Sequence, residues 1–153
     1  MSASINHTDV RVLYADTDAG GVVYNANYLR YFEIGRGALM RDWVCSYREI
    51  EEMGYYLPVT ESWLRYKAPA RYDDLITIET SVAELTHRLC TFAYRVVRAE
   101  EGLEKPRLLV KGYTVHVAVG LDGKLTSLPT EITSKLAAFI NPNPPVRRFG
   151  SEK

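Results

Sequence analysis

The sequence predicts a single α+β domain in which one long central helix is wrapped by a curved antiparallel sheet of five or six strands. Three observations lead to this prediction. One amphipathic segment at helical spacing comes early in the chain, four long β-branched and aromatic segments follow it, and the connections between those segments are short. Short connections favour antiparallel neighbours, because a parallel pair needs a crossover of a dozen or more residues.

The bulk composition indicates an ordinary globular chain. Its 153 residues fit one domain, which we place at residues 1–140. Lys+Arg and Asp+Glu are equal at 19 each, so no net charge favours a nucleic-acid partner. No apolar run approaches the roughly 18 residues of a membrane span, and the start lacks a signal-peptide pattern. Cys45 and Cys90 have no metal-binding spacing. We therefore expect a cytoplasmic protein with free thiols and no membrane insertion.

The first two elements are expected to be a strand and the long helix. Apolar and polar side chains alternate over residues 7–15, which favours a strand. A helix over residues 26–44 follows, and its apolar side comprises Tyr28, Phe32, Gly35, Leu39 and Trp43. Gly35 and Gly37 each cost about 1 kcal/mol of helix stability relative to Ala. We therefore expect this helix to pack closely on the sheet at both positions.

The remaining elements are a short helix, the strands and a final helix. Ser46 and Glu49 form a capping-box pattern that predicts a helix over residues 46–53, ended by Gly54. Strands are expected over residues 55–67, 75–85, 88–98 and 107–119, with a further short strand at 125–129. A last helix is expected to begin with Thr130 as N-cap. Residues 141–153 are rich in proline and charge, and we expect a flexible tail.

The connection between the first strand and the long helix carries more functional groups than a turn needs. It contains the run DTDAGGVVYNANY, residues 16–28. Gly20 and Gly21 permit a positive φ and a close approach of the backbone to another group. Asp16 and Asp18 precede the helix, where Asp is a common capping or turn residue, and Asp16 is interpreted as structural. No histidine or further acid joins the pair at ligand spacing, so we expect no metal site.

The wider segment YADTDAGGVVYNANYLRYFEIGR, residues 14–36, resembles the N-terminal signature of hot-dog-fold thioesterases of the 4-hydroxybenzoyl-CoA thioesterase class. It looks most similar to the tol-pal-associated (YbgC-type) acyl-CoA thioesterases, and RYDDLITIET (71–80) and LTSLPTEI (125–132) fall where that family has similar segments. The resemblance implies a hot-dog fold and hydrolysis of acyl-CoA thioesters without a cofactor. It also implies a dimer or a homotetramer (a dimer of dimers), with sites shared between subunits.

The same resemblance places the family's catalytic carboxylate at Asp18, which can act as a nucleophile or as a general base. Free N–H groups near Tyr24 and Asn25, at the start of the helix, can polarise the thioester oxygen. YbgC-type members usually carry His where this chain has Asn25. We expect Tyr24, Asn25 and Tyr28 to contact the substrate, with a helix cap as the alternative role of Asn25. The resemblance also places Arg88 near the CoA phosphates; the alternative is a solvated side chain.

We therefore expect an acyl-CoA thioesterase that acts on a short-chain or aromatic acyl group. Aromatic residues that can line its pocket, or equally belong to the core, are Tyr24, Tyr28, Tyr31, Phe32 and Trp63. One alternative is a thioesterase acting on acyl carrier protein, which would need a basic docking patch. The other is a non-catalytic acyl-CoA binding protein, because Asn25 cannot shuttle protons as a histidine does.

Overall fold

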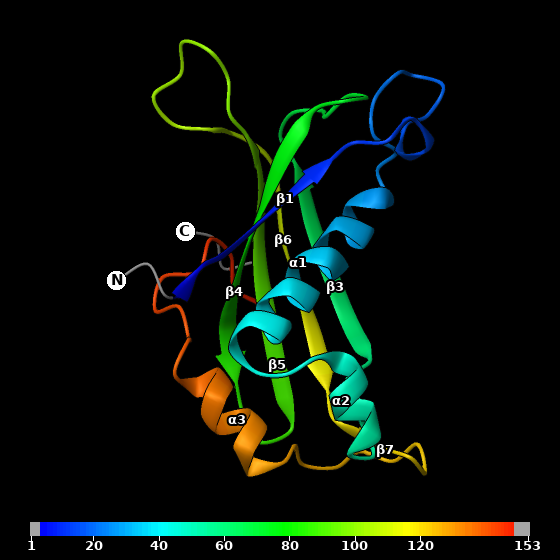
Figure 1. Ribbon diagram of the computed structural model, residues 1–153, viewed down its shortest axis with the longest axis vertical. Coiled ribbons are helices and arrows are strands. Elements are labelled where there is room, and N and C mark those ends of the chain that lie inside the picture. The colour runs from blue at the N-terminus through cyan, green and yellow to red at the C-terminus, as the bar shows by residue number, and fades with distance from the viewer. Residues whose placement is uncertain (1–3, 149–153) are drawn as a thin grey trace.

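The computed structural model describes residues 4–148, and its centre is a five-stranded antiparallel sheet with strand order β1-β4-β5-β6-β3. The long helix α1 (Asn27–Trp43) lies across one face of this sheet (Figure 1). The strands are β1 (Asn6–Arg11), β3 (Val59–Tyr66), β4 (Leu75–Leu85), β5 (Leu89–Arg98) and β6 (Arg107–Val117). Register shifts interrupt the β3–β6, β4–β5 and β5–β6 ladders, and such bulges bend a sheet. The predicted α+β class is confirmed.

The first strand is shorter than predicted. β1 pairs with β4 from Asn6 opposite Thr80 to Arg11 opposite Leu75, and then the chain turns into a 3-10 helix, η2 (Tyr14–Asp16). The expectation of a strand as far as residue 15 is wrong because Asp16 folds back on this segment. Its carboxylate accepts the Leu13 N–H at 2.9 Å, so the backbone there bonds to a side chain instead of to a neighbouring strand.

The long helix packs against the sheet through one glycine rather than two. A Cβ atom added at Gly35 would overlap the Thr80 hydroxyl and would lie 2.6 Å from Cγ2 of Ile78, both on β4. At Gly37 an added Cβ would meet only the end of the Arg41 side chain, 3.4 Å away. The predicted close approach is therefore confirmed at Gly35 and wrong at Gly37. Beside this contact, the Phe32 ring of α1 stacks on a tyrosine of β5 at 4.0 Å.

The second helix, α2 (Tyr47–Glu52), has the predicted capping box. The Ser46 hydroxyl accepts the Glu49 N–H, and the Glu49 carboxylate accepts the Ser46 N–H, each at 3.2 Å. The strand predicted over residues 55–67 is split into two. Its start, β2 (Tyr55–Tyr56), pairs with β7 (Val119–Gly120) in a small separate sheet, and only β3 joins the main one. Pro58 lies at the break, where its missing N–H removes a ladder hydrogen bond.

The C-terminal part of the chain lies on the sheet. The last helix, α3 (Thr130–Ala137), follows Pro129 and has no side-chain cap, so the prediction of Thr130 as N-cap is wrong. The segment predicted at 125–129 contributes only an isolated bridge to Val119. Residues 141–148 pack across the sheet face opposite α1, where Val146 is fully buried. This described part of the predicted tail is therefore held against the sheet, and residues 149–153 lie outside the described residues.

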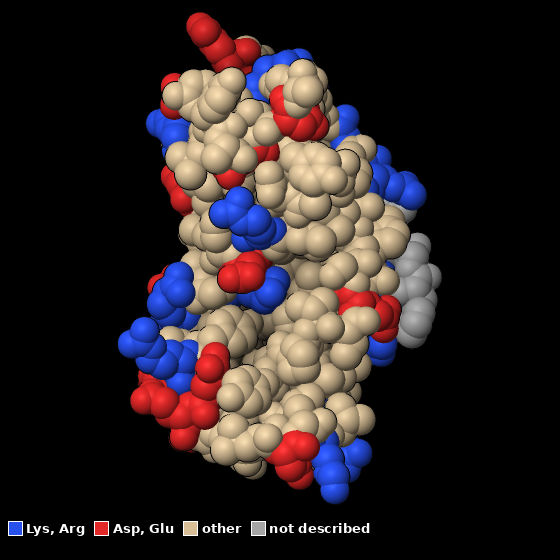
Figure 2. Space-filling model, turned by 90° about the vertical axis from the view of Figure 1, so that its right-hand side faces the viewer, with Lys and Arg blue, Asp and Glu red and all other residues tan. Residues whose placement is uncertain are grey.

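The sheet has two edges, β1 and β3, each with a hydrogen-bonded strand on one side only. Figure 2 turns the β3 side of Figure 1 toward the viewer and shows uncharged surface between scattered side chains of both signs. Within residues 4–148 no helix is both long and apolar enough to cross a bilayer.

Candidate active site

Residues 17–23, between η2 and α1, fold into a tight hairpin closed by a bridge between Thr17 and Val23. The Asp18 N–H donates to the Val22 carbonyl at 2.9 Å, and the Gly21 N–H donates to the Asp18 carbonyl at 3.0 Å. Gly21 has a φ of +79°, a conformation that glycine adopts without strain. Gly20 does not have a positive φ. Gly20 instead donates its N–H to Oδ1 of Asp18 at 2.8 Å, and an added Cβ would lie 3.1 Å from the same oxygen.

The two aspartates of the motif have different environments. Asp16 is buried, and its carboxylate accepts the Tyr31 hydroxyl at 2.9 Å and pairs with Arg30 at 3.3 Å. Together with the Leu13 N–H, these contacts tie the loop to α1 and occupy the carboxylate, as the structural interpretation of Asp16 requires. Asp18 is exposed. Among the described residues only the Gly20 N–H binds its carboxylate, so Oδ2 is available to another molecule.

Asp18 lies at the wall of a cavity of about 350 Å³. The cavity is lined by Asp18, Val22, Val23, Asn25, Tyr28, Tyr66, Lys67, Ala68 and Pro69. The loop before α1 thus faces the end of β3 and the residues that follow it. Asn25 and Tyr28 line the cavity, whereas Tyr24 is half-exposed and does not line it; the predicted substrate contacts stay predictions. The part contributed by residues 66–69 was not foreseen, because the sequence there indicates only the end of a strand and a turn.

Asn25, just before the start of α1, lines this cavity. The Tyr24 N–H is bound to the Asp16 carbonyl at 2.9 Å and cannot polarise a substrate. No hydrogen bond within residues 4–148 uses the N–H of Asn25, which directly precedes the N-cap residue of α1. The helix begins after Ala26 without a side-chain cap, so the alternative role of Asn25 as a helix cap is wrong. The partial positive charge of the helix start favours an anion at this position.

Two tyrosines fix the cavity walls. The buried Tyr28 hydroxyl accepts the Ala70 N–H at 3.2 Å, and burial raises its pKa above the ordinary value. The Tyr66 hydroxyl donates to the Asn25 carbonyl at 3.1 Å and so joins the end of β3 to the start of α1. The two rings meet edge to face, with centroids 5.7 Å apart. A neutral Tyr28 is a structural support here rather than an acid.

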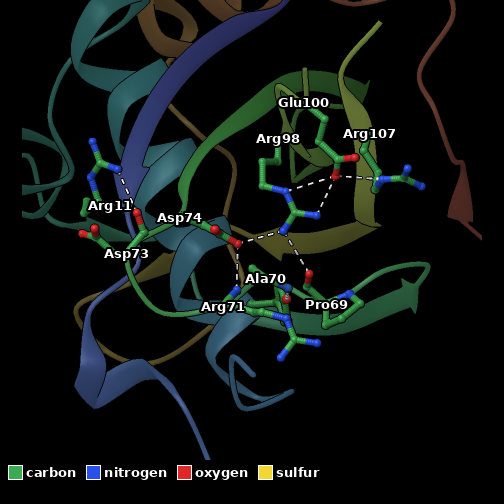
Figure 3. A network of polar contacts seen from close by, with 10 residues as sticks. Arg11, Pro69, Ala70, Arg71, Asp73, Asp74, Arg98, Glu100 and Arg107 are labelled. Atoms are coloured by element: carbon green, nitrogen blue, oxygen red, sulfur yellow. Dashed lines mark hydrogen bonds and ion pairs between the residues drawn. The ribbon is translucent and has the colours of Figure 1, made fainter. Parts of the chain in front are cut away.

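A network of charged side chains holds the segment opposite Asp18 (Figure 3). Arg98, at the end of β5, donates to the Asp74 carboxylate at 2.7 Å, to the Pro69 carbonyl at 3.1 Å and to the Glu100 carboxylate at 2.6 Å. Arg107 donates to the same Glu100 oxygen at 2.8 Å. These interactions raise the pKa of Arg98 and lower that of Glu100. Charge-assisted bonds of this kind are among the strongest that a partly exposed cluster can form.

The network acts on the cavity through the segment 69–74. Pro69 lines the cavity, and the next residue, Ala70, accepts the Val23 N–H at 2.9 Å while donating to Tyr28. Val23 belongs to the hairpin that carries Asp18. Arg98 is therefore the residue that secures one wall of the cavity from outside it. No sequence pattern signals this role, because Arg98 and its partners on the loop are distant in the chain.

Arg88 and three aromatic residues lie elsewhere. Arg88 is exposed in the turn between β4 and β5, whereas Asp18 lies near the other end of these strands. β4 has 11 residues, so the two positions are separated by about 35 Å of strand. Tyr31 and Phe32 belong to the core, and Trp63 stacks on Tyr113 on the far face of the sheet. One chain therefore does not bring Arg88 to Asp18.

A larger cavity, of about 510 Å³, lies between α1, α2 and the start of β3. It is lined by Glu33, Arg36, Tyr47, Ile50, Glu51, Tyr55, Tyr56, Leu57 and Pro58. Behind it Tyr94, Thr114 and His116 form a buried hydrogen-bonded row that ends on the Leu57 carbonyl. Its carboxylates, Glu33 and Glu51, belong to α1 and α2, and no residue of the run 16–28 lines it. The smaller cavity is the candidate site, because Asp18, Asn25 and Tyr28 of the run 16–28 line it.

Comparisons with known proteins show the family and the fold of the chain. A model of the thioesterase-like superfamily matches residues 12–136. An acyl-CoA thioesterase, YbgC, of Haemophilus influenzae is 37% identical over 126 residues, which cover 80% of this chain and 88% of that protein. A hypothetical protein of Thermus thermophilus, TT1821, has a crystal structure with a TM-score of 0.80 and 32% identity, covering 90% of this chain and 98% of the other. A DHNA-CoA thioesterase from Staphylococcus aureus has a TM-score of 0.74 and 27% identity, covering 80% of each chain.

These likenesses confirm the predicted hot-dog fold and the resemblance on which it was based. The family match extends beyond the motif around Asp18 and runs from the end of β1 into α3.

Proposed function

The chain belongs to the thioesterase-like superfamily, and we propose that it hydrolyses the thioester bond of a short-chain or aromatic acyl-CoA. One observation carries the proposal. The exposed Asp18 carboxylate lines a cavity beside the unused Asn25 N–H at the start of a helix. Thioester hydrolysis needs this pair of groups, one to attack or to activate water and one to stabilise the negative charge that develops on the carbonyl oxygen. Similarity to acyl-CoA thioesterases supports the choice of thioester.

Asp18 can act in two ways. As a nucleophile, Oδ2 attacks the thioester carbonyl, the C–S bond breaks, the thiol takes up a proton, and water then hydrolyses the resulting anhydride. As a general base, the same oxygen takes a proton from a water molecule that attacks the carbonyl. In both routes the Asn25 N–H donates to the carbonyl oxygen, and the Gly20 N–H keeps Oδ1 in place. The Asn25 side chain adds a second donor facing the cavity.

The site is proposed to be shared between two subunits. β3 is an unpaired edge, and antiparallel pairing with the same strand of a second copy would satisfy it. Such pairing places residues 66–69 of one subunit opposite the start of β3 in its partner, so the Asp18 cavity would adjoin the larger cavity of the other chain. This pairing would also bring the turn between β4 and β5 of the partner subunit to the side of Asp18. Arg88 lies in that turn, so it could contact the CoA phosphates only from the other subunit. Light scattering should then give more than the 17.4 kDa of one chain. A cytoplasmic location is proposed because Cys45 and Cys90 are free thiols.

Replacing Asp18 by Asn tests the proposed chemistry. The amide has the same shape but is neither nucleophilic nor basic, so thiol release from acyl-CoA should fall by about a hundredfold or more, with an unchanged melting temperature. Asp122→Asn, in the turn after β7, is the matched control. Activity of Asp18→Asn within threefold of wild type would contradict the mechanism. Binding of acyl-CoA without turnover by the wild type would select the non-catalytic alternative, and turnover only of acyl carrier protein thioesters would select the other carrier.

A further inference from the structure

A patch of exposed apolar side chains lies next to the Asp18 cavity. Tyr14 is 77% exposed and Tyr72 58% exposed, and their rings meet edge to face with centroids 5.6 Å apart. Leu13, next to Tyr14, and Leu75, three residues after Tyr72, are also exposed. Single exposed apolar residues are common, but a group of them on adjoining segments marks a binding surface. The two segments are joined by backbone bonds of Val12 to residues 73 and 74, so the patch is a fixed surface.

Two arginines border this aromatic patch. The Arg71 guanidinium has no carboxylate within ion-pair distance among the described residues, and Figure 3 shows it directed away from the Asp74 and Arg98 pair. Arg11 donates to the backbone carbonyl of Asp73 at 2.8 Å, so its charge is not neutralised by that contact. Two acidic side chains lie on the same segment, Asp73 and Asp74, and Asp74 is paired with Arg98. Arg11 and Arg71 against Asp73 leave one excess positive charge at the patch.

The patch continues from the wall of the cavity. Pro69 lines the cavity, and Arg71 and Tyr72 follow it on the segment that Arg98 and Asp74 hold in place. A thioester whose carbonyl lies at Asp18 can therefore extend its carrier arm over this segment toward Tyr72. The patch belongs to the β1 and β4 side of the sheet, away from the β3 edge proposed to pair with a second copy. Pairing through β3 would leave it accessible.

We propose that this patch binds the nucleotide end of CoA, with the adenine ring on the Tyr72–Tyr14 pair and a phosphate on Arg71. The inference rests on the proposed function and assigns the nucleotide to the same chain as Asp18, instead of to the distant Arg88. An aromatic face next to an unpaired guanidinium fits a ligand that combines a base with phosphates. A purely apolar partner would not pair with the arginine side chains. An acidic carrier protein would pair with the arginines but would not need the two exposed tyrosine rings.

The test compares one acyl group on two carriers. Benzoyl-CoA and benzoyl-pantetheine present the same thioester, but only the first has the nucleotide. Arg71→Ala and Tyr72→Ala should each lower the ratio of kcat/KM for the CoA ester to that for the pantetheine ester by about tenfold, which is about 1.4 kcal/mol. Asp73→Asn should raise this ratio because it removes the opposing charge. Arg48→Ala, an exposed arginine on α2, is the matched control and should leave the ratio unchanged.

Calorimetric titration with CoA itself separates this proposal from the proposed function, because it does not need turnover. Weaker CoA binding by Arg71→Ala and Tyr72→Ala, with wild-type affinity for pantetheine, would support the site even if neither ester were hydrolysed. An equal loss on both esters would overturn it, since the residues would then act on the thioester end. The proposal would also be overturned if Arg88→Ala weakened CoA binding and the patch variants did not. It would likewise be overturned if the patch variants lowered kcat/KM for benzoyl-acyl carrier protein and not for benzoyl-CoA.

Discussion

Replacing Gly35 or Gly37 by Ala should change stability in opposite directions, although both glycines lie on the same helix. In a helix exposed to water, either change would stabilise by about 1 kcal/mol through helix propensity. Gly35, however, faces β4, where an added Cβ would overlap the Thr80 hydroxyl and lie 2.6 Å from Ile78. Both neighbours are β-branched and restricted at χ1, so they cannot swing aside. The helix itself must move away from the sheet.

The sizes follow from the two effects. Overpacking of a core costs about 1–3 kcal/mol, so Gly35→Ala should be destabilising by up to about 2 kcal/mol after the gain of about 1 kcal/mol in propensity. For a domain of this size the melting temperature should fall by up to about 8 °C. At Gly37 the nearest atom is the end of the flexible Arg41 side chain, at 3.4 Å. Gly37→Ala should therefore raise the melting temperature by about 2–4 °C.

Differential scanning calorimetry at one fixed protein concentration gives both values, because association would otherwise shift the transitions. A Gly35→Ala variant that melts at or above the temperature of Gly37→Ala would refute the packing argument. That result would mean that α1 can separate from β4 at little cost.

Three further predictions concern pH, positioning and the replaced histidine. Burial lowers the pKa of His116 to about 4, so the folded state favours neutral imidazole. The contribution of this neutral form to folding stability is complete above pH 6.5 and is lost as pH falls from 6.5 toward 4. Urea unfolding midpoints should show this loss for wild type and not for His116→Asn. Arg98→Met should lower kcat/KM about tenfold, because it removes the hydrogen bond that holds Pro69 at the cavity wall, and Arg98→Lys should restore part of the activity. Arg107→Met, which removes the contact with Glu100, is the control, and an equal effect of the two variants would count against a positioning role of Arg98. Asn25→His should change turnover little, because Asp18 and the helix start are proposed to supply attack and polarisation. A gain above about tenfold with a new pH limb near 6–7 would show instead that a histidine at position 25 acts in proton transfer.

The sequence by itself determined the class of fold, the long helix and the residue expected to carry the chemistry. Periodicity alone separates α1 from the strands, because a helix and a strand repeat their buried positions at different spacings. The capping box at Ser46 and the wide signature around Asp18 are likewise local patterns. Each can be read because all its parts lie within a few residues of one another. The resemblance carried by that signature extended the prediction to thioester hydrolysis.

Tertiary structure decided which groups of the motif are free. Nothing in the sequence tells that Asp16 is buried against Tyr31 while Asp18 faces a cavity, or that the Tyr24 N–H is occupied and that of Asn25 is not. The same holds for the two glycines of α1, since only Gly35 meets β4. Arg98, the segment 66–69 and the Tyr14–Tyr72 pair come together from positions far apart in the chain. Their roles depend on the register of the strands and on hydrogen-bond partners, which a local pattern does not specify.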